Sequence, residues 1–200
     1  MSVPERLLLL APGAGAPSSS AWMRAQKQRL AALGHVEAFD YPYQLAGRKA
    51  PDRTPVLLAA HAEALERAAV GHGGPKVLVG KSMGGRMGCH LAVKLAGSIA
   101  ALVCLGYPLV GMSGDVRDAV LLELATPVLF VQGTRDKLCP LDRLEDVRRR
   151  MHAANELHVV QGGDHSLVVG KRELAARGET QADVDRRITD AIARFLSAHA

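Results

Sequence analysis

The sequence lacks the cysteine pattern of a secreted or metal-binding protein. Its 200 residues include only three cysteines, with no CxxC pair and no metal-type spacing. An odd number of scattered cysteines suits a reducing compartment better than a disulfide scaffold. We therefore expect Cys89, Cys104 and Cys139 to be inert thiols, and we expect no bound metal.

Long apolar runs are also missing. No segment approaches the ~18 consecutive apolar residues that span a bilayer. The N-terminal stretch LLLLAPGAGA has an apolar core of only four leucines, follows the acidic Glu5 and continues straight into glycine-rich sequence, which does not fit a signal peptide. These absences predict a cytoplasmic protein without a membrane partner.

Basic charge is not concentrated enough to indicate nucleic-acid binding. The net charge of +5 is spread along the chain, and its one cluster, residues 148–150, has no aromatic residues interleaved with it. Leu144, Val147 and Met151 around the cluster follow helical spacing, so the arginines are expected to form the solvated face of a helix. At most, the net positive charge would favour the binding of anionic substrates.

Short apolar runs alternate with amphipathic segments along the whole chain, which is typical of parallel strands joined by crossover helices. With 48% hydrophobic residues and no Pro/Ser-rich linker, residues 1–200 are expected to form a single domain. Helices are expected after Ser20, from Thr54-Pro55 and over about 182–196, and residues 116–124 are long enough for one more. Six strands are expected at 6–11, 35–40, 76–80, 100–105, 127–132 and 156–161.

The stretch VLVGKSMGG, residues 77–85, contains two overlapping motifs. A phosphate-binding loop, G-x-x-x-x-G-K-[ST], requires a glycine where Pro75 stands, and its interval is filled by a strand-like apolar run. A G-x-S-x-G nucleophile elbow requires a strand, a sharp turn and a helix, and all three are predicted around Ser82. The elbow is the favoured interpretation, with a purely structural glycine-rich turn as its alternative.

A serine nucleophile needs a histidine base, and the base needs a carboxylate to orient it. Ligands of parallel sheets bind beyond the carboxyl ends of the strands, and of eight histidines only His165 follows the final expected strand. Asp136 directly follows the strand 127–132, in the chain order Ser, Asp, His that α/β-hydrolases use. Asp164 is the rival carboxylate, but as the neighbour of His165 it is poorly placed to reach the ring.

The segments GKSMGGRMG, VQGTRD and GGDHS, which carry these three residues, resemble the α/β-hydrolases. More narrowly, the chain resembles the small dienelactone-hydrolase-like branch, akin to the hydrolase-like domain of the NSL-complex regulatory subunit. The resemblance covers nearly the full chain and begins at the family's third strand. It implies a minimal α/β-hydrolase fold, a three-layer sandwich whose mainly parallel sheet of about six strands is flanked by helices, with no large cap.

The resemblance also assigns an oxyanion hole. Residues 11–16 match the family's His-Gly-x-Gly loop, with Ala11-Pro12 at the usual histidine position. Carried over, the two oxyanion donors are the backbone N–H groups of Ala14 and Met83. A plain glycine-rich turn is the alternative for this loop.

Two features set the expected pocket apart. Dienelactone hydrolase itself carries a cysteine nucleophile where this chain has Ser82, so that particular substrate is not expected. Residues 106–126 are too few for a large helical cap, which predicts an open, shallow site walled by Tyr107, Leu109, Leu138 and Trp22, with ordinary packing as the alternative for each. The Lys81 side chain is expected to point away from Ser82, at the surface or behind the reacting groups.

Together these features predict a carboxylesterase-like serine hydrolase that cleaves small ester or related acyl bonds through an acyl-enzyme, without metal or organic cofactor. Its partner would be a small acyl substrate. Two alternatives stay open: a non-catalytic binding or scaffold module on the same fold, and a thioesterase or peptidase on the same residues. The sequence fixes neither the natural substrate nor the oligomeric state.

Overall fold

A single parallel sheet forms the centre of the computed structural model, which describes residues 5–111 and 114–200. All strand pairs are parallel, and the order across the sheet is β2-β1-β3-β4-β5-β6. The strands are β1 (Leu7–Ala11), β2 (His35–Ala38), β3 (Lys76–Lys81), β4 (Ala101–Leu105), β5 (Val128–Gly133) and β6 (Asn155–Val160). Each lies within two residues of its predicted position, which confirms the predicted fold class.

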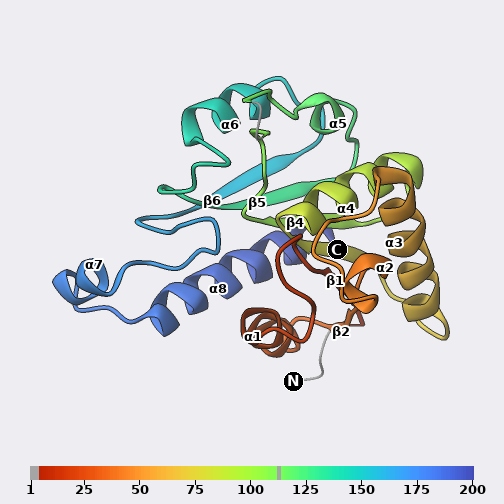
Figure 1. Cartoon of the computed structure of the whole chain (residues 1–200), viewed down its shortest axis with the longest axis horizontal. Helices are drawn as coiled ribbons and strands as arrows, with labels where there is room; N and C mark the ends of the chain where they lie inside the picture. Colours follow the sequence, from red (N-terminus) through yellow and green to blue (C-terminus); the bar gives the residue numbers. More distant parts are fainter. Residues whose placement is uncertain (1–4, 112–113) are drawn as a thin grey trace.

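Helices cover both faces of this sheet, so the four central strands β1, β3, β4 and β5 are buried along nearly their whole length, whereas the edge strands β2 and β6 are partly exposed. Side chains alternate between two cores: Leu7 and Leu9 of β1 enter one, and Leu8 and Leu10 enter the other. The first core contains side chains of α3 (Thr54–Ala69), α4 (Met83–Lys94), α5 (Ala119–Leu122) and α6 (Leu141–Arg148). The second contains those of α1 (Ala21–Leu30) and α8 (Gln181–His199), which gives the three-layer arrangement seen in Figure 1.

The helix ends follow local chemistry that the sequence carries. The Ser20 hydroxyl accepts from the Met23 N–H at the start of α1, and Pro55 lies in the first turn of α3. Thr180 and Asp183 form a reciprocal capping box at the start of α8. Along α8, Val184, Ile188 and Ile192 recur at every fourth position and are buried against the sheet.

Three short segments differ from the prediction. The expected helix over 116–124 is reduced to the four residues of α5, because Val116 is extended and forms an antiparallel bridge with Val110. The short helices α2 (Pro42–Leu45) and α7 (Lys171–Ala176) were not predicted. Both are too short to show a helical period in the sequence.

The arginine cluster 148–150 has acidic and amide neighbours at the end of α6. Arg148 bonds Asn155 and Glu145, Arg149 pairs with Asp146, and Arg150 with Asp118.

None of the helices that the structure describes combines the length and the apolar character needed to cross a bilayer.

Candidate active site

The turn between β3 and α4 holds Ser82 in a backbone conformation that side chains rarely adopt. Its φ is 49° and its ψ is −114°, a region that costs about 1 to 3 kcal/mol and is found mainly at functional sites. The flanking glycines make the turn possible, because a Cβ on Gly80 would lie 2.2 Å from the Gly85 nitrogen, and one on Gly84 would lie 2.6 Å from the Ala11 oxygen. The Ser82 N–H is anchored on the carbonyl of Leu105, the last residue of β4.

His165 lies in the loop that follows β6. The loop is closed by an antiparallel bridge between Gly163 and Val169. Within it, the Asp164 carboxylate accepts from the N–H groups of Ser166 and Val168 at 2.8 and 3.0 Å. Asp164 therefore stabilises the loop that carries His165, and makes no hydrogen bond to the His165 ring among the described residues.

Ser82, His165 and Asp136 form a continuous hydrogen-bonded chain. The Ser82 Oγ lies 2.8 Å from His165 Nε2, and His165 Nδ1 lies 2.7 Å from Asp136 Oδ2. With the Nδ1 proton donated to the carboxylate, Nε2 is left to accept from the serine hydroxyl. The three side chains come from the ends of β3, β5 and β6, so the strand-end rule brings together residues far apart in the chain.

Hydrogen bonding keeps Asp136 ionised although its side chain is fully buried. Burial by itself would raise the pKa of this carboxyl, but the hydrogen bond and charge of His165, the Leu138 N–H and the Gln132 amide together lower the pKa below its usual value. The Gln132 amide also accepts from the Tyr107 N–H at 3.0 Å, so both of its ends are fixed. This supporting role was not predicted, although a glutamine inside the buried run VLFVQG is the signal that could have revealed it.

The predicted oxyanion loop lies directly against the serine. A Cβ on Gly13 would be 3.5 Å from the Ser82 Cβ. The carbonyls of the loop are held by α2, where the Tyr43 hydroxyl donates to Ala14 O at 3.0 Å and Gln44 Nε2 donates to Gly13 O and Ala16 O. Within residues 5–111 and 114–200, the N–H groups of Ala14 and Met83 donate to no other group. The roles of Tyr43 and Gln44 were not predicted.

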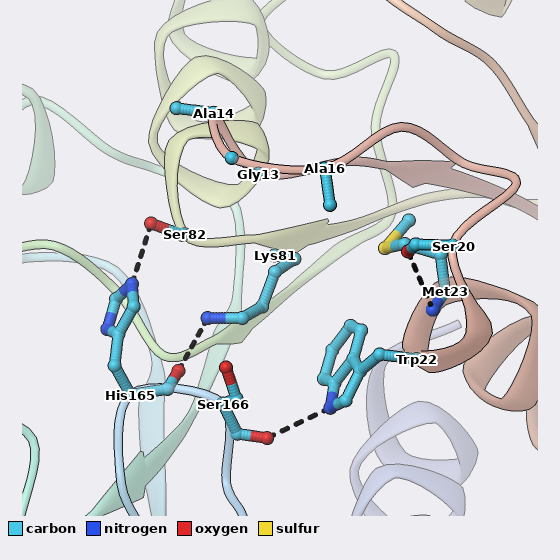
Figure 2. A pocket seen from close by; sticks show the side chains of 11 residues that line it. Gly13, Ala14, Ala16, Ser20, Trp22, Met23, Lys81, Ser82, His165 and Ser166 are labelled. Carbon is cyan, nitrogen blue, oxygen red and sulfur yellow. Dashed lines mark hydrogen bonds between the residues drawn. The ribbon is translucent and has the colours of Figure 1, made fainter. Parts of the chain in front are cut away.

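A cavity of about 250 Å³ opens beside Ser82 (Figure 2). Trp22, one of the four predicted wall residues, lines it, and its indole N–H donates to the Ser166 carbonyl at 2.9 Å. The lining residues are Gly13, Ala14, Gly15, Ala16, Ser20, Trp22, Met23, Lys81, Ser82, His165 and Ser166.

The other three predicted wall residues do not line this cavity. Tyr107 and Leu109 are fully buried in the core beneath α4, where the Tyr107 ring packs edge-on against Phe130. Leu138 is 37% exposed at the surface. It contributes to the site through its backbone N–H, which donates a hydrogen bond to the Asp136 carboxylate. The chain after β4 turns back into the core instead of along the site, which a prediction from strand ends could not anticipate.

Lys81 is buried, not at the surface. Its side chain is on the same face of β3 as Val77 and Val79, which belong to the core beneath α1 and α8. It therefore points away from the Ser82 side chain, as predicted, but α1 and the His165 loop cover it, and only 9% of the residue is exposed. Its Nζ donates to the His165 carbonyl, and Figure 2 shows the side chain along the cavity between His165 and Trp22.

Residues 4–197 match a family model described as an alpha/beta hydrolase domain. The chain belongs to the α/β-hydrolase family. The match spans nearly the whole chain, as the sequence motifs implied.

Solved structures of α/β-hydrolases share the fold at low sequence identity. Est1E from Butyrivibrio proteoclasticus with bound ferulic acid is 18% identical, with a TM-score of 0.71 over 98% of this chain and 90% of that chain. Dienelactone hydrolase from Anabaena variabilis is 16% identical, with a TM-score of 0.72 over 98% and 89%. An alpha-beta serine hydrolase homologue from Coxiella burnetii is 15% identical, with a TM-score of 0.73 over 96% and 86%. The predicted resemblance to a dienelactone-hydrolase-like branch agrees with these neighbours.

No group of three or more His, Cys, Asp or Glu side chains in the described residues is arranged to hold a metal ion. Cys89 and Cys104 have their sulfurs 3.8 Å apart, and all three cysteines are buried and unpaired by disulfides. Burial raises the pKa of Cys139 to about 12, and the hydrogen bond between Cys104 and Cys89 raises the pKa of Cys104.

Proposed function

We propose that this α/β-hydrolase is a serine hydrolase that cleaves small carboxylic esters or related acyl bonds. The observation that carries the proposal is the hydrogen-bonded chain from Ser82 through His165 to Asp136, next to two free backbone N–H groups. A module that only bound ligands would have no need of a serine on a strained turn with a histidine aligned on its hydroxyl.

In the first half of the reaction, His165 Nε2 takes the proton from Ser82 as its Oγ attacks the acyl carbon. The oxygen that gains negative charge in the tetrahedral intermediate accepts from the N–H groups of Ala14 and Met83. Asp136 holds the imidazole in the required tautomer and stabilises its charged form. As the bond to the leaving group breaks, His165 passes its proton to the departing alcohol, which leaves the acyl group on Ser82.

In the second half, a water molecule replaces the alcohol. His165 removes a proton from the water as its oxygen attacks the acyl carbon, and the same two N–H groups hold the second oxyanion. The bond to Ser82 Oγ then breaks, His165 returns the proton to the serine, and a carboxylic acid is released.

Labelling of Ser82 by a fluorophosphonate probe tests the proposal, because only an activated serine attacks phosphorus at a useful rate. The wild type should be labelled rapidly, Ser82→Ala should not be labelled, and the control Ser98→Ala, at an exposed turn, should react like wild type. Labelling that persisted in Ser82→Ala would contradict the role of this serine. A folded wild type that neither reacted nor turned over any ester would instead support the binding or scaffold module.

A further inference from the structure

Lys81 is the one side chain with a formal charge among those that line the cavity beside Ser82. The rest of the lining consists of glycine and alanine backbone, Met23, the Trp22 indole, hydroxyls and the His165 ring. A buried cation in such a small space determines which substituents a ligand can place there, because its charge is only weakly screened.

The protein satisfies only part of the hydrogen-bonding capacity of this ammonium. A lysine has three N–H donors, and within the described part of the chain Nζ donates to a single acceptor, the His165 carbonyl. It lies 5.7 Å from the centroid of the Trp22 ring, a favourable but weaker contact. Asp136 and Asp164 are the nearby negative charges, and neither forms an ion pair with it, because Asp136 bonds the His165 ring and Asp164 bonds its own loop.

Burial of the Lys81 ammonium also affects its pKa. Burial lowers the pKa of Lys81 to about 8, against the opposing effect of Asp136 and Asp164. The group is therefore mostly charged at neutral pH, but in a site that does not fully compensate the charge. An anionic ligand would supply the missing acceptor and would keep the ammonium charged.

We propose that the preferred substrates of this enzyme carry a carboxylate on their acyl group, which binds Lys81 Nζ beside the Trp22 indole. This inference rests on the proposed function, and it names the substrate class as monoesters of short dicarboxylic acids. The acyl group is the part concerned because it stays attached to Ser82, on the cavity wall, after the alcohol has left. A cavity of about 250 Å³ leaves room for only a short chain between the ester carbon and the carboxylate.

Two esters that differ only at the end of the acyl chain test the proposal. The mono-4-nitrophenyl ester of glutaric acid ends in a carboxylate where 4-nitrophenyl valerate ends in a methyl group. Wild type should show a kcat/KM about 10- to 100-fold higher for the glutarate ester, the range expected for a hydrogen bond to a charged group. Spontaneous hydrolysis of each ester is subtracted.

Lys81→Met keeps the length of the side chain without its charge. In this variant the preference for the glutarate ester should disappear while the valerate ester is still hydrolysed. Lys94→Met, which removes an exposed lysine near the end of α4, should keep the wild-type ratio and so controls for net charge. If Lys81 serves only to hold the His165 loop, Lys81→Met will slow both esters equally, and the unchanged ratio will overturn the proposal.

A binding measurement separates this inference from the proposed function. Trp22 is the only tryptophan, so its fluorescence reports on the cavity without turnover. In Ser82→Ala, glutarate should change the fluorescence saturably, at constant ionic strength, while neutral glutaramide should not, and adding Lys81→Met should abolish the response. Saturable, Lys81-dependent binding without esterase activity would retain the anion site and reject the hydrolase. Esterase activity with no such binding and no preference for the glutarate ester would retain the hydrolase and reject the anion site.

Discussion

Two carboxylates lie close to His165: Asp164 is its neighbour in the chain, and Asp136 is near its ring in space. They make different contacts. Asp136 accepts from the ring at 2.7 Å and is fully buried, whereas Asp164 bonds N–H groups of its own loop. The difference follows from where each side chain enters the site, since Asp136 approaches the ring from the end of a neighbouring strand.

Asp136→Asn should therefore lower kcat by up to ~10⁴-fold, because an amide favours the wrong tautomer of the histidine. Asp164→Asn should cost far less. The measurement compares the kcat of both variants on a short 4-nitrophenyl ester, together with their melting temperatures. The assignment of Asp136 is wrong if Asp164→Asn is the more damaging change while both variants melt like wild type.

His61 is another buried ionisable residue, and it does not line the cavity. It is completely buried on α3, with its Nδ1 3.2 Å from the Tyr41 hydroxyl and its Nε2 without a partner among the described residues. Burial lowers the pKa of His61 to about 3. The Tyr41 hydroxyl can donate to Nδ1, which suits the neutral ring.

This histidine should make the fold sensitive to acid. Its pKa is about 6.5 in the unfolded chain and about 3 in the folded protein, so in that window the unfolded state binds a proton that the folded state does not. Stability from His61 is then fully present above the unfolded pKa and is lost as the pH falls, by roughly 2 to 3 kcal/mol at about pH 4.5. Urea unfolding at about pH 7.5 and 4.5 should show a smaller pH dependence in His61→Gln by this amount, whatever the absolute stability of the variant. Equal pH dependence in both proteins would contradict the assignment.

The elbow between β3 and α4 is the element that fixes the position of Ser82, and its glycines are not equivalent. A Cβ on Gly84 would lie 2.6 Å from the Ala11 and Pro12 oxygens, which begin the oxyanion loop. A Cβ on Gly88, one turn further along the same helix, would meet its nearest atom at 3.6 Å, an ordinary contact.

Gly84→Ala should therefore displace the oxyanion loop, lower stability and sharply reduce fluorophosphonate labelling. Gly88→Ala is the matched control, and it should be neutral or stabilising by up to about 1 kcal/mol, because alanine is the better helix former. Denaturant unfolding and labelling rates of both variants measure the two effects. Equal behaviour of the two variants would show that the close contact at Gly84 is relieved without cost.

At the scale of the whole molecule, the site is a small cavity, and the described residues between β4 and β5 place no large helical cap over it. The described residues between β4 and β5 contain a single short helix, α5, which packs into the core beneath α4. The cavity, at about 250 Å³, falls below the range of about 300 to 1,000 Å³ that is common for ligand pockets. A cavity of this size is too small to enclose a long acyl chain.

Short acyl chains should therefore be hydrolysed faster than long ones. Across a series of neutral 4-nitrophenyl esters, kcat/KM should be highest at acetate to butyrate and should fall steeply toward palmitate. The series is measured in one detergent concentration, with release of 4-nitrophenol by alkali as the control for ester availability. A clear preference for palmitate would overturn this prediction.

The sequence by itself determined the sheet, the elbow and the chain order of the proposed reacting groups. These follow from local patterns: strands appear as apolar runs, the turn at Ser82 as closely spaced glycines, and His165 and Asp136 as polar residues just after strands. Because parallel strands all end at the same edge of the sheet, a position after a strand is already a position in space. The order of the strands across the sheet, with β1 between β2 and β3, was not predicted and came from the structure.

Only the tertiary structure decided what surrounds those groups. Tyr107 turned into the core, Gln132 proved to hold Asp136, and Gln44 of α2 proved to hold the oxyanion loop. Lys81 and Trp22 meet in one cavity because β3 directs alternate side chains toward the face that α1 covers. Such contacts depend on the path of loops and on how helices pack across the sheet, and the periodicity of a single segment encodes neither.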